Sequence, residues 1–249
     1  MDYIIFNGIL TTMGYEGEYI TGSHKSGPVW NLIPGVREDM FPHQQEAFEF
    51  MWKKLAGGID IEEVKKFVKT DTLSGCVISH APGTGKTRLA ITFVQSYLEL
   101  FPQCFPVIIA PKGMLDTWET EFRKWNVKIP FHILNSRDIH WHGDKTVEKL
   151  ASNDKELARR LSISSIDKNY MRALKLRSWA EGSSIIGLSY SLFQKLTKGE
   201  GNDDDKLRQM LLQRPDLLIL DEGHTPRNKE SNIFKALAEV RTKRRIILS

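Results

Sequence analysis

Residues suited to hold a phosphate chain lie in the run ISHAPGTGKT, between an apolar segment and a helical one. Gly83 and Gly85 carry no Cβ, so the backbone there can turn its N–H groups toward an anion. The helix expected to begin near Lys86 adds the positive end of its dipole. Lys86 would reach the β- and γ-phosphates, and the Thr87 hydroxyl would hold Mg²⁺. The predicted phosphate site consists of Gly83, Thr84, Gly85, Lys86 and Thr87.

One position of this loop departs from the full pattern G-x-x-x-x-G-K-[ST]. His80 stands where the pattern has its first glycine. Taken alone, the run therefore leaves an incidental glycine turn open as an alternative. For His80 itself we expect a structural role and not a catalytic one.

An acidic pair follows the apolar run 217–220, at the carboxyl end of a predicted strand. Ligands of parallel sheets bind at this end. Asp221 is placed to hold Mg²⁺, and Glu222 to orient and deprotonate the water that attacks the γ-phosphate. His224 would report the state of that phosphate to neighbouring segments. With the phosphate loop upstream, the pair predicts a nucleoside triphosphatase site more strongly than a solvated acidic turn.

A third motif, FPHQQE, precedes both of these at the start of a predicted helix. The amide of Gln44 can donate and accept hydrogen bonds, as an adenine edge requires, which would favour ATP. Without the other two motifs, this segment would be an ordinary polar helix start.

Five short apolar runs, separated by helical stretches, would position these residues. The runs are 76–78, 107–109, 185–188, 217–220 and 246–248. Continuous apolar runs of this length suit strands that crossover helices cover on both faces. The sequence therefore predicts an α/β fold with a doubly wound, mostly parallel sheet.

Two of the predicted helices have apolar faces with helical spacing. The face of the first, which follows Pro42 and ends at Gly57, is formed by Phe48, Met51, Trp52 and Leu55. The face of the second, which follows the phosphate loop, is formed by Leu89, Phe93, Tyr97 and Phe101. Both helices are therefore expected to pack against the sheet.

Three segments lie outside this alternation of strands and helices. Residues 1–27 are mixed and Gly-rich, so we expect an N-terminal arm before a domain of residues 28–249. Residues 135–179 are charged, helix-prone and longer than a crossover needs, which predicts a helical insertion of one or two surface helices. Residues 199–206, GEGNDDDK, predict a solvated loop.

The composition limits the environment more than the activity. The net charge of +4 favours a polyanionic partner but does not establish one. Cys76 and Cys104 do not have metal-ligand spacing, so neither a disulfide framework nor a zinc cluster is expected. No run approaches the roughly 18 apolar residues that cross a bilayer, and the N-terminus lacks the basic charge of a signal peptide. We expect an intracellular protein with no membrane partner.

In their order along the chain, the motifs resemble helicase superfamily 2 and, more narrowly, the Swi/Snf-like remodelling ATPases. The matching segments are MFPHQQEAFEFMW, SHAPGTGKT, PVIIAPKGMLDTWETEFRKW, SIIGLSYSLFQKL, LILDEGHTPRN and RRIILS. Details such as HAPGTGKTRLA and DEGHTPRN look like the plant CLASSY group. The resemblance implies the first RecA-like, P-loop ATP-binding lobe of a two-lobed motor. The chain ends directly after the apolar run 246–248, so we expect a fragment without the second lobe.

The resemblance also implies a face that tracks DNA. Residues 111–125 and the turn at Ser189 and Tyr190 would lie on that face. Lys112 and Thr117 lie just beyond a predicted strand end, where they suit contacts to the phosphate backbone. The aromatic residues of the segment are expected in a helix core instead: Trp118, Phe122 and Trp125.

These features predict a lobe that binds ATP and Mg²⁺ in a nuclear translocase of double-stranded DNA. The resemblance to the CLASSY group implies partnership with RNA polymerase IV machinery in RNA-directed DNA methylation and gene silencing. The second lobe would supply the arginine finger, so this chain alone should hydrolyse ATP negligibly. An ATP-binding scaffold with little hydrolysis, and an RNA helicase, stay open as alternatives.

Overall fold

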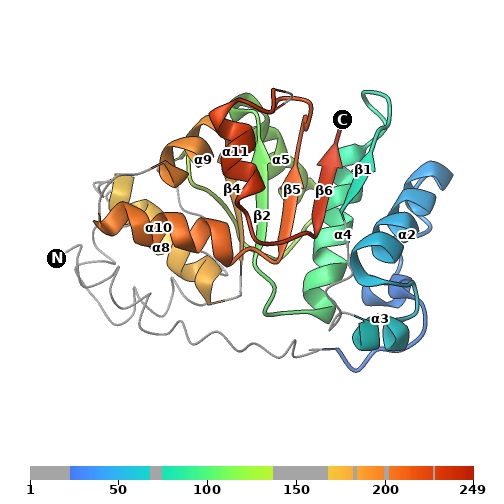
Figure 1. The fold of residues 1–249 in the computed structure, drawn as a ribbon. Helices are drawn as coiled ribbons and strands as arrows, with labels where there is room; N and C mark the ends of the chain where they lie inside the picture. Colours follow the sequence, from blue (N-terminus) through green and yellow to red (C-terminus); the bar gives the residue numbers. More distant parts are fainter. Residues whose placement is uncertain (1–22, 68–74, 137–167, 182–183, 199–201, 227) are drawn as a thin grey trace.

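A six-stranded sheet, in which all neighbouring strands are parallel, forms the centre of the molecule (Figure 1). The computed structural model describes residues 23–67, 75–136, 168–181, 184–198, 202–226 and 228–249. The strands are β1 (Cys76–Ile78), β2 (Pro106–Ala110), β3 (Phe131–Ile133), β4 (Ile185–Ser189), β5 (Leu217–Leu220) and β6 (Arg245–Leu248). Their order across the sheet is β1-β6-β5-β2-β4-β3.

Helices cover both faces of this sheet (Figure 1). One layer consists of α2 (Pro42–Ala56), α3 (Ile61–Phe67), α4 (Lys86–Leu100) and α5 (Leu115–Lys124). The other consists of α8 (Lys168–Ala180), α9 (Tyr190–Thr197), α10 (Asn202–Gln213) and α11 (Asn232–Ala238). On β2, Ile108 packs into the first layer, whereas Val107 and Ile109 pack into the second. The predicted doubly wound α/β fold is confirmed.

All five predicted strands are present, and β3 is the one that the sequence reading missed. It is three residues long, with His132 at its centre, so it shows no continuous apolar run. His132 is nevertheless buried, and its ring Nε2 lies 3.3 Å from Ser178 Oγ. The expectation that every strand is covered on both faces is wrong for β1, where Val77 is 55% exposed at the edge of the sheet.

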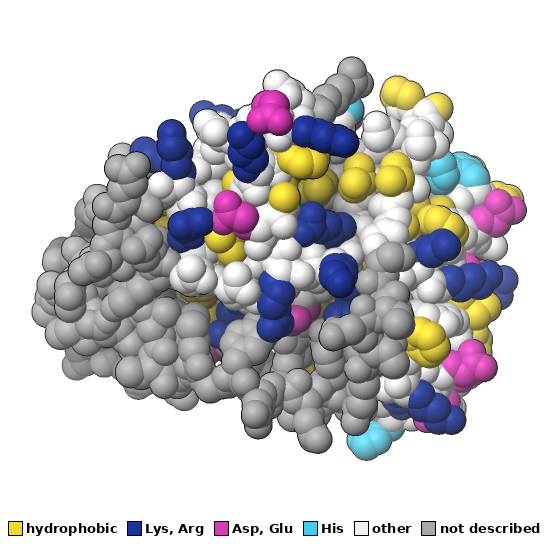
Figure 2. Space-filling view, viewed as in Figure 1, with side chains coloured by type: hydrophobic (Ala, Val, Ile, Leu, Met, Phe, Trp, Pro, Cys, Tyr) yellow, Lys and Arg dark blue, Asp and Glu magenta, His cyan; other side chains and the backbone are white. Residues whose placement is uncertain are grey.

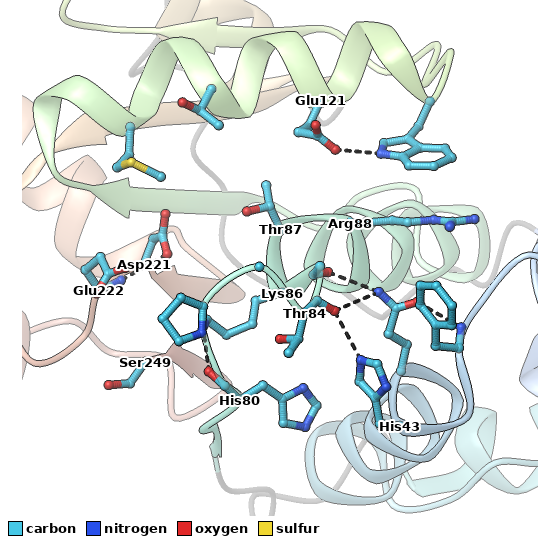
Figure 3. A pocket seen from close by; sticks show the side chains of 18 of the residues that line it. His43, His80, Thr84, Lys86, Thr87, Arg88, Glu121, Asp221, Glu222 and Ser249 are labelled. Atoms are coloured by element: carbon cyan, nitrogen blue, oxygen red, sulfur yellow. Dashed lines mark hydrogen bonds between the residues drawn. The ribbon is translucent and has the colours of Figure 1, made fainter.

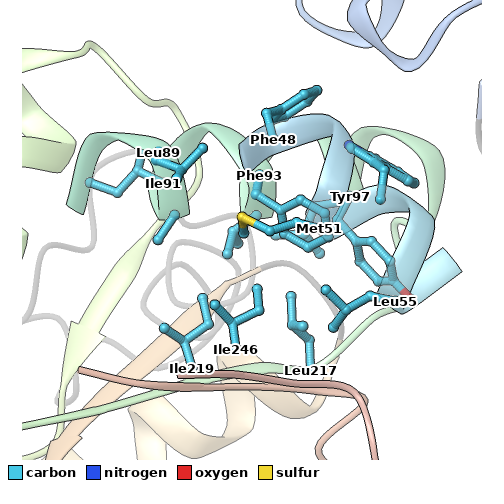
Figure 4. Close-up of a cluster of buried hydrophobic side chains, with 14 of the residues drawn as sticks. Phe48, Met51, Leu55, Leu89, Ile91, Phe93, Tyr97, Leu217, Ile219 and Ile246 are labelled. Atoms are coloured by element: carbon cyan, nitrogen blue, oxygen red, sulfur yellow. The ribbon is translucent and has the colours of Figure 1, made fainter. Parts of the chain in front are cut away.

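The two predicted apolar helix faces meet each other above the sheet (Figure 4). Trp52 of α2 lies 5.3 Å from Phe93 of α4, measured between ring centroids, and Phe93 lies 5.7 Å from Tyr97. Helix α2 ends where Gly57 adopts a left-handed φ of 82°. This aromatic contact holds the second half of α2 against α4. At the start of α2, Gln44 donates to the Thr84 carbonyl over 3.1 Å, which places this end of the helix beside the phosphate loop.

Two predicted segments differ from the observed structure. Residues 202–206, predicted as loop, belong to α10. Asn and Asp are residue types that helix starts favour, so the acidic run is compatible with the first turn of a helix. Residues 168–180 form α8, which is no surface helix: Trp179 is fully buried and its indole donates to the Pro106 carbonyl over 3.0 Å. Helix α8 is the crossover between β3 and β4.

The other boundary predictions fall largely outside the described residues. Residues 1–22 of the predicted arm and residues 137–167 of the predicted insertion lie there. From Val29 onward the chain contributes to the core, since Val29 and Trp30 in the 3₁₀ helix η1 (Val29–Leu32) are buried. In the part of the chain that the structure describes, no helix combines the length and hydropathy needed to span a membrane.

Candidate nucleotide site

A cavity of about 810 Å³ opens at the carboxyl edge of the sheet. Segments that follow β1, β5 and β6 line it, together with the start of α2, the start of α4 and residues of α5. The cavity brings together most of the predicted site residues: Gln44, Gly83, Thr84, Gly85, Lys86, Thr87, Thr117, Asp221 and Glu222. Three motifs that are far apart in the sequence therefore share one concave surface (Figure 3).

The phosphate loop has the backbone that the two glycines were predicted to allow. Gly83 and Gly85 both have a φ of 80°, a left-handed value that other residues rarely adopt. No atom lies near the place where a Cβ of Gly83 would be, so the space above the loop is free for a ligand. A Cβ on Gly85 would collide with the Gln44 amide. The loop therefore fits a phosphate chain, and only glycine fits the loop.

Lys86 folds across this loop. Its Nζ donates to the carbonyl oxygens of His80 and Ala81, over 2.7 and 3.3 Å. Burial, helped by the charges of His43 and Lys86, lowers the pKa of His80, which favours the neutral ring. The ammonium group is thus held at the cavity by two neutral acceptors that a phosphate oxygen can replace.

Gln44 is bound to the same loop. Its side chain is buried, and Nε2 donates to the carbonyls of Thr84 and Gly85 over 3.1 and 3.5 Å. Oε1 accepts from the Phe41 backbone N–H over 3.0 Å. His43 Nε2 also lies 3.1 Å from the Thr84 carbonyl oxygen. Gln44 faces the cavity as predicted, but both of its amide hydrogens are directed at the loop, and adenine contact stays a prediction.

Asp221 occupies the opposite end of the cavity and is 5% exposed. Burial raises the pKa of its carboxyl, against the opposing effect of the Trp118 indole, which donates to Oδ2 over 2.8 Å. The Glu222 backbone N–H donates to Oδ1 over 3.0 Å. A buried carboxylate that shares a cavity with the Thr87 hydroxyl is an oxygen donor set that suits Mg²⁺.

Glu222 and His224 form a pair beside Asp221. Glu222 has a left-handed φ of 49°, an uncommon and strained value for a residue with a side chain. Its Oε2 lies 3.2 Å from His224 Nδ1. Glu222 lines the cavity, whereas His224 does not, so His224 reaches the site through Glu222. This contact is compatible with the predicted coupling role, which stays a prediction.

The comparisons with known proteins show which family the chain belongs to. Residues 43–249 match the family model described as the SNF2-related domain. The chain belongs to the SNF2-related domain family. It is 46% identical over 237 residues to SNF2 domain-containing protein CLASSY 3 of Arabidopsis thaliana, covering 90% of this chain and 16% of that protein. It is also 46% identical to CLASSY 4 of the same plant, covering 90% of this chain and 19% of the relative.

More distant relatives include the human transcriptional regulator ATRX, which is 27% identical over 215 residues, covering 84% of this chain and 8% of ATRX. A solved structure, the Sulfolobus solfataricus SWI2/SNF2 ATPase core in complex with dsDNA, is 20% identical with a TM-score of 0.47. That likeness covers 84% of this chain and 31% of the solved one. The chain spans less than a fifth of the length of these curated relatives. The predicted family and the resemblance to the CLASSY group are confirmed.

In this SNF2-related domain, the residues predicted to contact DNA have different environments. Lys112, in the 3₁₀ helix η2 (Lys112–Met114), is exposed, whereas Thr117 lines the nucleotide cavity. Ser189 and Tyr190 are buried. The Tyr190 hydroxyl donates to the Asp221 carbonyl over 2.8 Å, and Ser189 Oγ caps α9 by accepting from the Leu192 N–H. The Tyr190 hydroxyl therefore supports the acid end of the site, and the Ser189 hydroxyl supports α9. Of the four residues, Lys112 and Thr117 are exposed, so these two are open to a phosphate backbone.

For two tryptophans of the α5 segment, the sequence did not predict the full environment: the contact that Trp118 makes with Asp221, and the exposure of Trp125. Trp118 and Phe122 are buried as predicted, but Trp118 also donates to Asp221; a buried indole N–H usually has a partner, which was the available signal. Trp125, predicted in the same core, is instead 36% exposed at the cavity. It is the last of the three aromatic residues, at the C-cap of α5, where the helix no longer faces the sheet.

Proposed function

We propose that this SNF2-related domain binds ATP with Mg²⁺ and acts as the first lobe of a motor that hydrolyses ATP on double-stranded DNA. One observation carries the proposal: the phosphate loop, the buried Asp221 and the adjacent Glu222 line a single cavity. A cavity that combines a free cradle, a lysine and a buried acid suits a magnesium-bound polyphosphate.

Each group has a distinct part in binding and hydrolysis. The backbone of Gly83 and Gly85 would receive the phosphates, and the Lys86 ammonium would exchange its two carbonyl partners for phosphate oxygens. Thr87 and Asp221 would hold Mg²⁺, which neutralises phosphate charge when bound. Glu222 would take the proton of the attacking water, and its contact with His224 would link that step to the surface.

The proposed track is double-stranded DNA, and the proposed location is the nucleus. Support comes from membership in the SNF2-related domain family and from the similarity to CLASSY 3 and CLASSY 4. On the face drawn in Figure 2, basic side chains are also more frequent than acidic ones among the described residues. The similarity to the CLASSY proteins further supports a role beside RNA polymerase IV machinery in RNA-directed DNA methylation.

Hydrolysis requires a second lobe in this proposal. Among the described residues, no arginine lines the γ-phosphate end of the cavity, which is formed by Asp221, Glu222 and Ser249. A second RecA-like lobe would supply that charge, and its contribution is typically about 10³- to 10⁵-fold in rate. The chain by itself should therefore bind ATP and turn it over negligibly.

Equilibrium binding of Mg-ATP to this chain tests the proposal. Lys86→Ala should weaken binding at least about tenfold, because hydrogen bonds to charged groups are worth about 1.5–3 kcal/mol. Lys53→Ala, on the exposed side of α2, is the matched control and should change nothing. Equal affinity in the wild type and Lys86→Ala would refute the site.

A further inference from the structure

The turn of residues 222–226, which follows β5, holds its first residue in a strained backbone conformation. Glu222 has a left-handed φ of 49°, which is unfavourable for a residue with a Cβ. Such a conformation persists only where the surrounding structure imposes it. Because Glu222 lines the cavity beside Asp221, the contacts that impose it also determine where the Glu222 carboxylate lies (Figure 3).

Hydrogen bonds hold the peptide groups on both sides of the Glu222 Cα. On one side, the Glu222 N–H donates to Asp221 Oδ1 over 3.0 Å. On the other side, the Glu222 carbonyl accepts from Thr225. The next N–H, that of Gly223, donates to the Leu248 carbonyl over 2.9 Å. A residue has only two soft backbone torsions, and both lie between these peptide groups, so holding the groups fixes the conformation.

Thr225 contributes to this arrangement with its side chain as well as its backbone. Its N–H donates to the Glu222 carbonyl over 2.9 Å, and its Oγ1 donates to the same oxygen over 2.8 Å. Thr225 is exposed, so burial does not force its hydroxyl to bond to the turn. The buried Pro226 follows, and a proline disfavours helical backbone for the residue before it. Thr225 is therefore kept in the turn by its neighbour.

The side chain of Glu222 is held less firmly than its backbone. Its Oε2 lies 3.2 Å from His224 Nδ1, and the side chains of Glu222 and His224 are 41% and 45% exposed. An exposed pair of this kind contributes little to fixing a side chain. The position of the carboxylate therefore depends on the backbone of Glu222.

We propose that Thr225 is a positioning residue for the general base, because its hydroxyl holds the Glu222 backbone in the conformation that directs the carboxylate into the cavity. This inference rests on the proposed function and adds a residue to its machinery. Without the hydroxyl, the Glu222 carbonyl keeps only the N–H of Thr225, and the strained φ can relax toward the right-handed region. A displacement of about 1 Å can cost about 100-fold in rate.

The test measures ATP turnover by this domain joined to a second lobe, with double-stranded DNA present. Thr225→Val removes the hydroxyl and keeps the branched shape. It should lower kcat about tenfold and change KM for Mg-ATP by less than about twofold, because Glu222 acts on water and does not bind the phosphates. Thr225→Ser keeps a hydroxyl and should keep most of the wild-type kcat.

Thr242→Val is the matched control for the lost hydroxyl. Thr242 Oγ1 also donates to a backbone carbonyl, that of Asp216, over 2.9 Å. Both residues precede their strands, β6 and β5, at the edge of the sheet opposite the cavity. Thr242→Val should therefore lower the stability of the domain and leave kcat unchanged.

A double variant tests whether Thr225 acts through Glu222. In a Glu222→Gln background, Thr225→Val should lower turnover no further, since the group that it positions is already gone. Losses that multiply in the double variant would overturn the positioning role. So would a wild-type kcat in Thr225→Val, or equal losses in Thr225→Val and Thr225→Ser. A wild type without turnover would instead refute the proposed function, and this inference with it.

Discussion

The two ends of the cavity are built by different means: the acid end, at Asp221 and Glu222, and the opposite end, at Phe41, Arg88 and Trp125. In the proposed function the base of the nucleotide extends toward this second end, which we call the base end. At the acid end, Asp221 follows a fully buried strand, and two core residues, Trp118 and Tyr190, hold its carboxylate and its carbonyl. At the base end, Phe41 and Trp125 are exposed residues at helix ends, fixed by a few polar contacts. The carboxylate that the proposed chemistry needs is thus held by the core, whereas the opposite end of the cavity is lined by exposed rings.

The largest predicted difference between the ends concerns turnover. In a protein that joins this domain to a second lobe, Glu222→Gln should lower ATP turnover at least about 100-fold, because a positioned general base typically contributes that much. Binding of Mg-ATP should stay near wild type. Glu230→Gln, an exposed acid paired with Lys235, is the control for lost charge. Turnover that survives in Glu222→Gln would remove the catalytic role from the acid end.

A substitution in the phosphate loop, which lies between the two ends, tests how strictly position 85 requires glycine. Gly85→Ala should destabilise the domain by about 2–3 kcal/mol, since it combines a left-handed φ with a collision against Gln44. Gly113→Ala is the matched control, because a Cβ there meets no atom and its φ is not left-handed. Denaturant unfolding measures both. A Gly85→Ala variant as stable as Gly113→Ala would show that neither the left-handed φ nor the contact with Gln44 constrains this position.

The dependence of Mg-ATP binding on pH tests the hydrogen bond at the acid end. Because the pKa of Asp221 is raised, the carboxylate is lost on acidification at a higher pH than for an ordinary aspartate, and Mg-ATP binding weakens there. Trp118→Phe removes a hydrogen-bond donor that lowers the pKa of Asp221, so the pH at which Mg-ATP binding is half lost should be higher in the variant. At the midpoint pH of the wild type, the variant should bind Mg-ATP about tenfold more weakly.

Trp179→Phe is the control for this experiment. Trp179 is another fully buried tryptophan, whose indole donates to a backbone carbonyl away from the cavity. Its substitution should destabilise the domain without moving the pH midpoint. If both variants move the midpoint alike, Trp118 acts through stability and not through Asp221.

The smallest effect is expected for stability at the base end. Arg88→Met should lower the free energy of unfolding by about 1–2 kcal/mol, because the Arg88 side chain is 15% exposed, lies over the Trp125 ring and donates to the Asp39 carbonyl. Phe93→Ala, in the core beneath, should cost about 3–5 kcal/mol. Thermal or denaturant unfolding compares them, and equal losses would mean that the base end is part of the core.

The acid end could be predicted from the sequence because a buried strand requires consecutive apolar residues and the phosphate loop requires glycines, and both requirements are visible as local patterns. Two such patterns can be recognised from the local sequence alone: the apolar run that Asp221 and Glu222 follow, and the two glycines before Lys86. The base end could not, because Phe41 and Trp125 carry the same apolar character as core residues, and only the fold shows that they face solvent. Strand β3 was not predicted for a related reason: His132 is polar, and its contact with Ser178, which is distant in the sequence, is seen only in the folded chain.

The central claim is that this cavity is the ATP site of a DNA-driven motor, and ATP turnover tests it most directly. Turnover would be measured on this domain joined to the second lobe that the proposal requires, with and without double-stranded DNA, beside Lys86→Ala. We predict that DNA stimulates turnover and that Lys86→Ala abolishes the stimulated rate. Turnover no higher than that of Lys86→Ala, with Mg-ATP still bound, would contradict a motor and identify a nucleotide-binding scaffold.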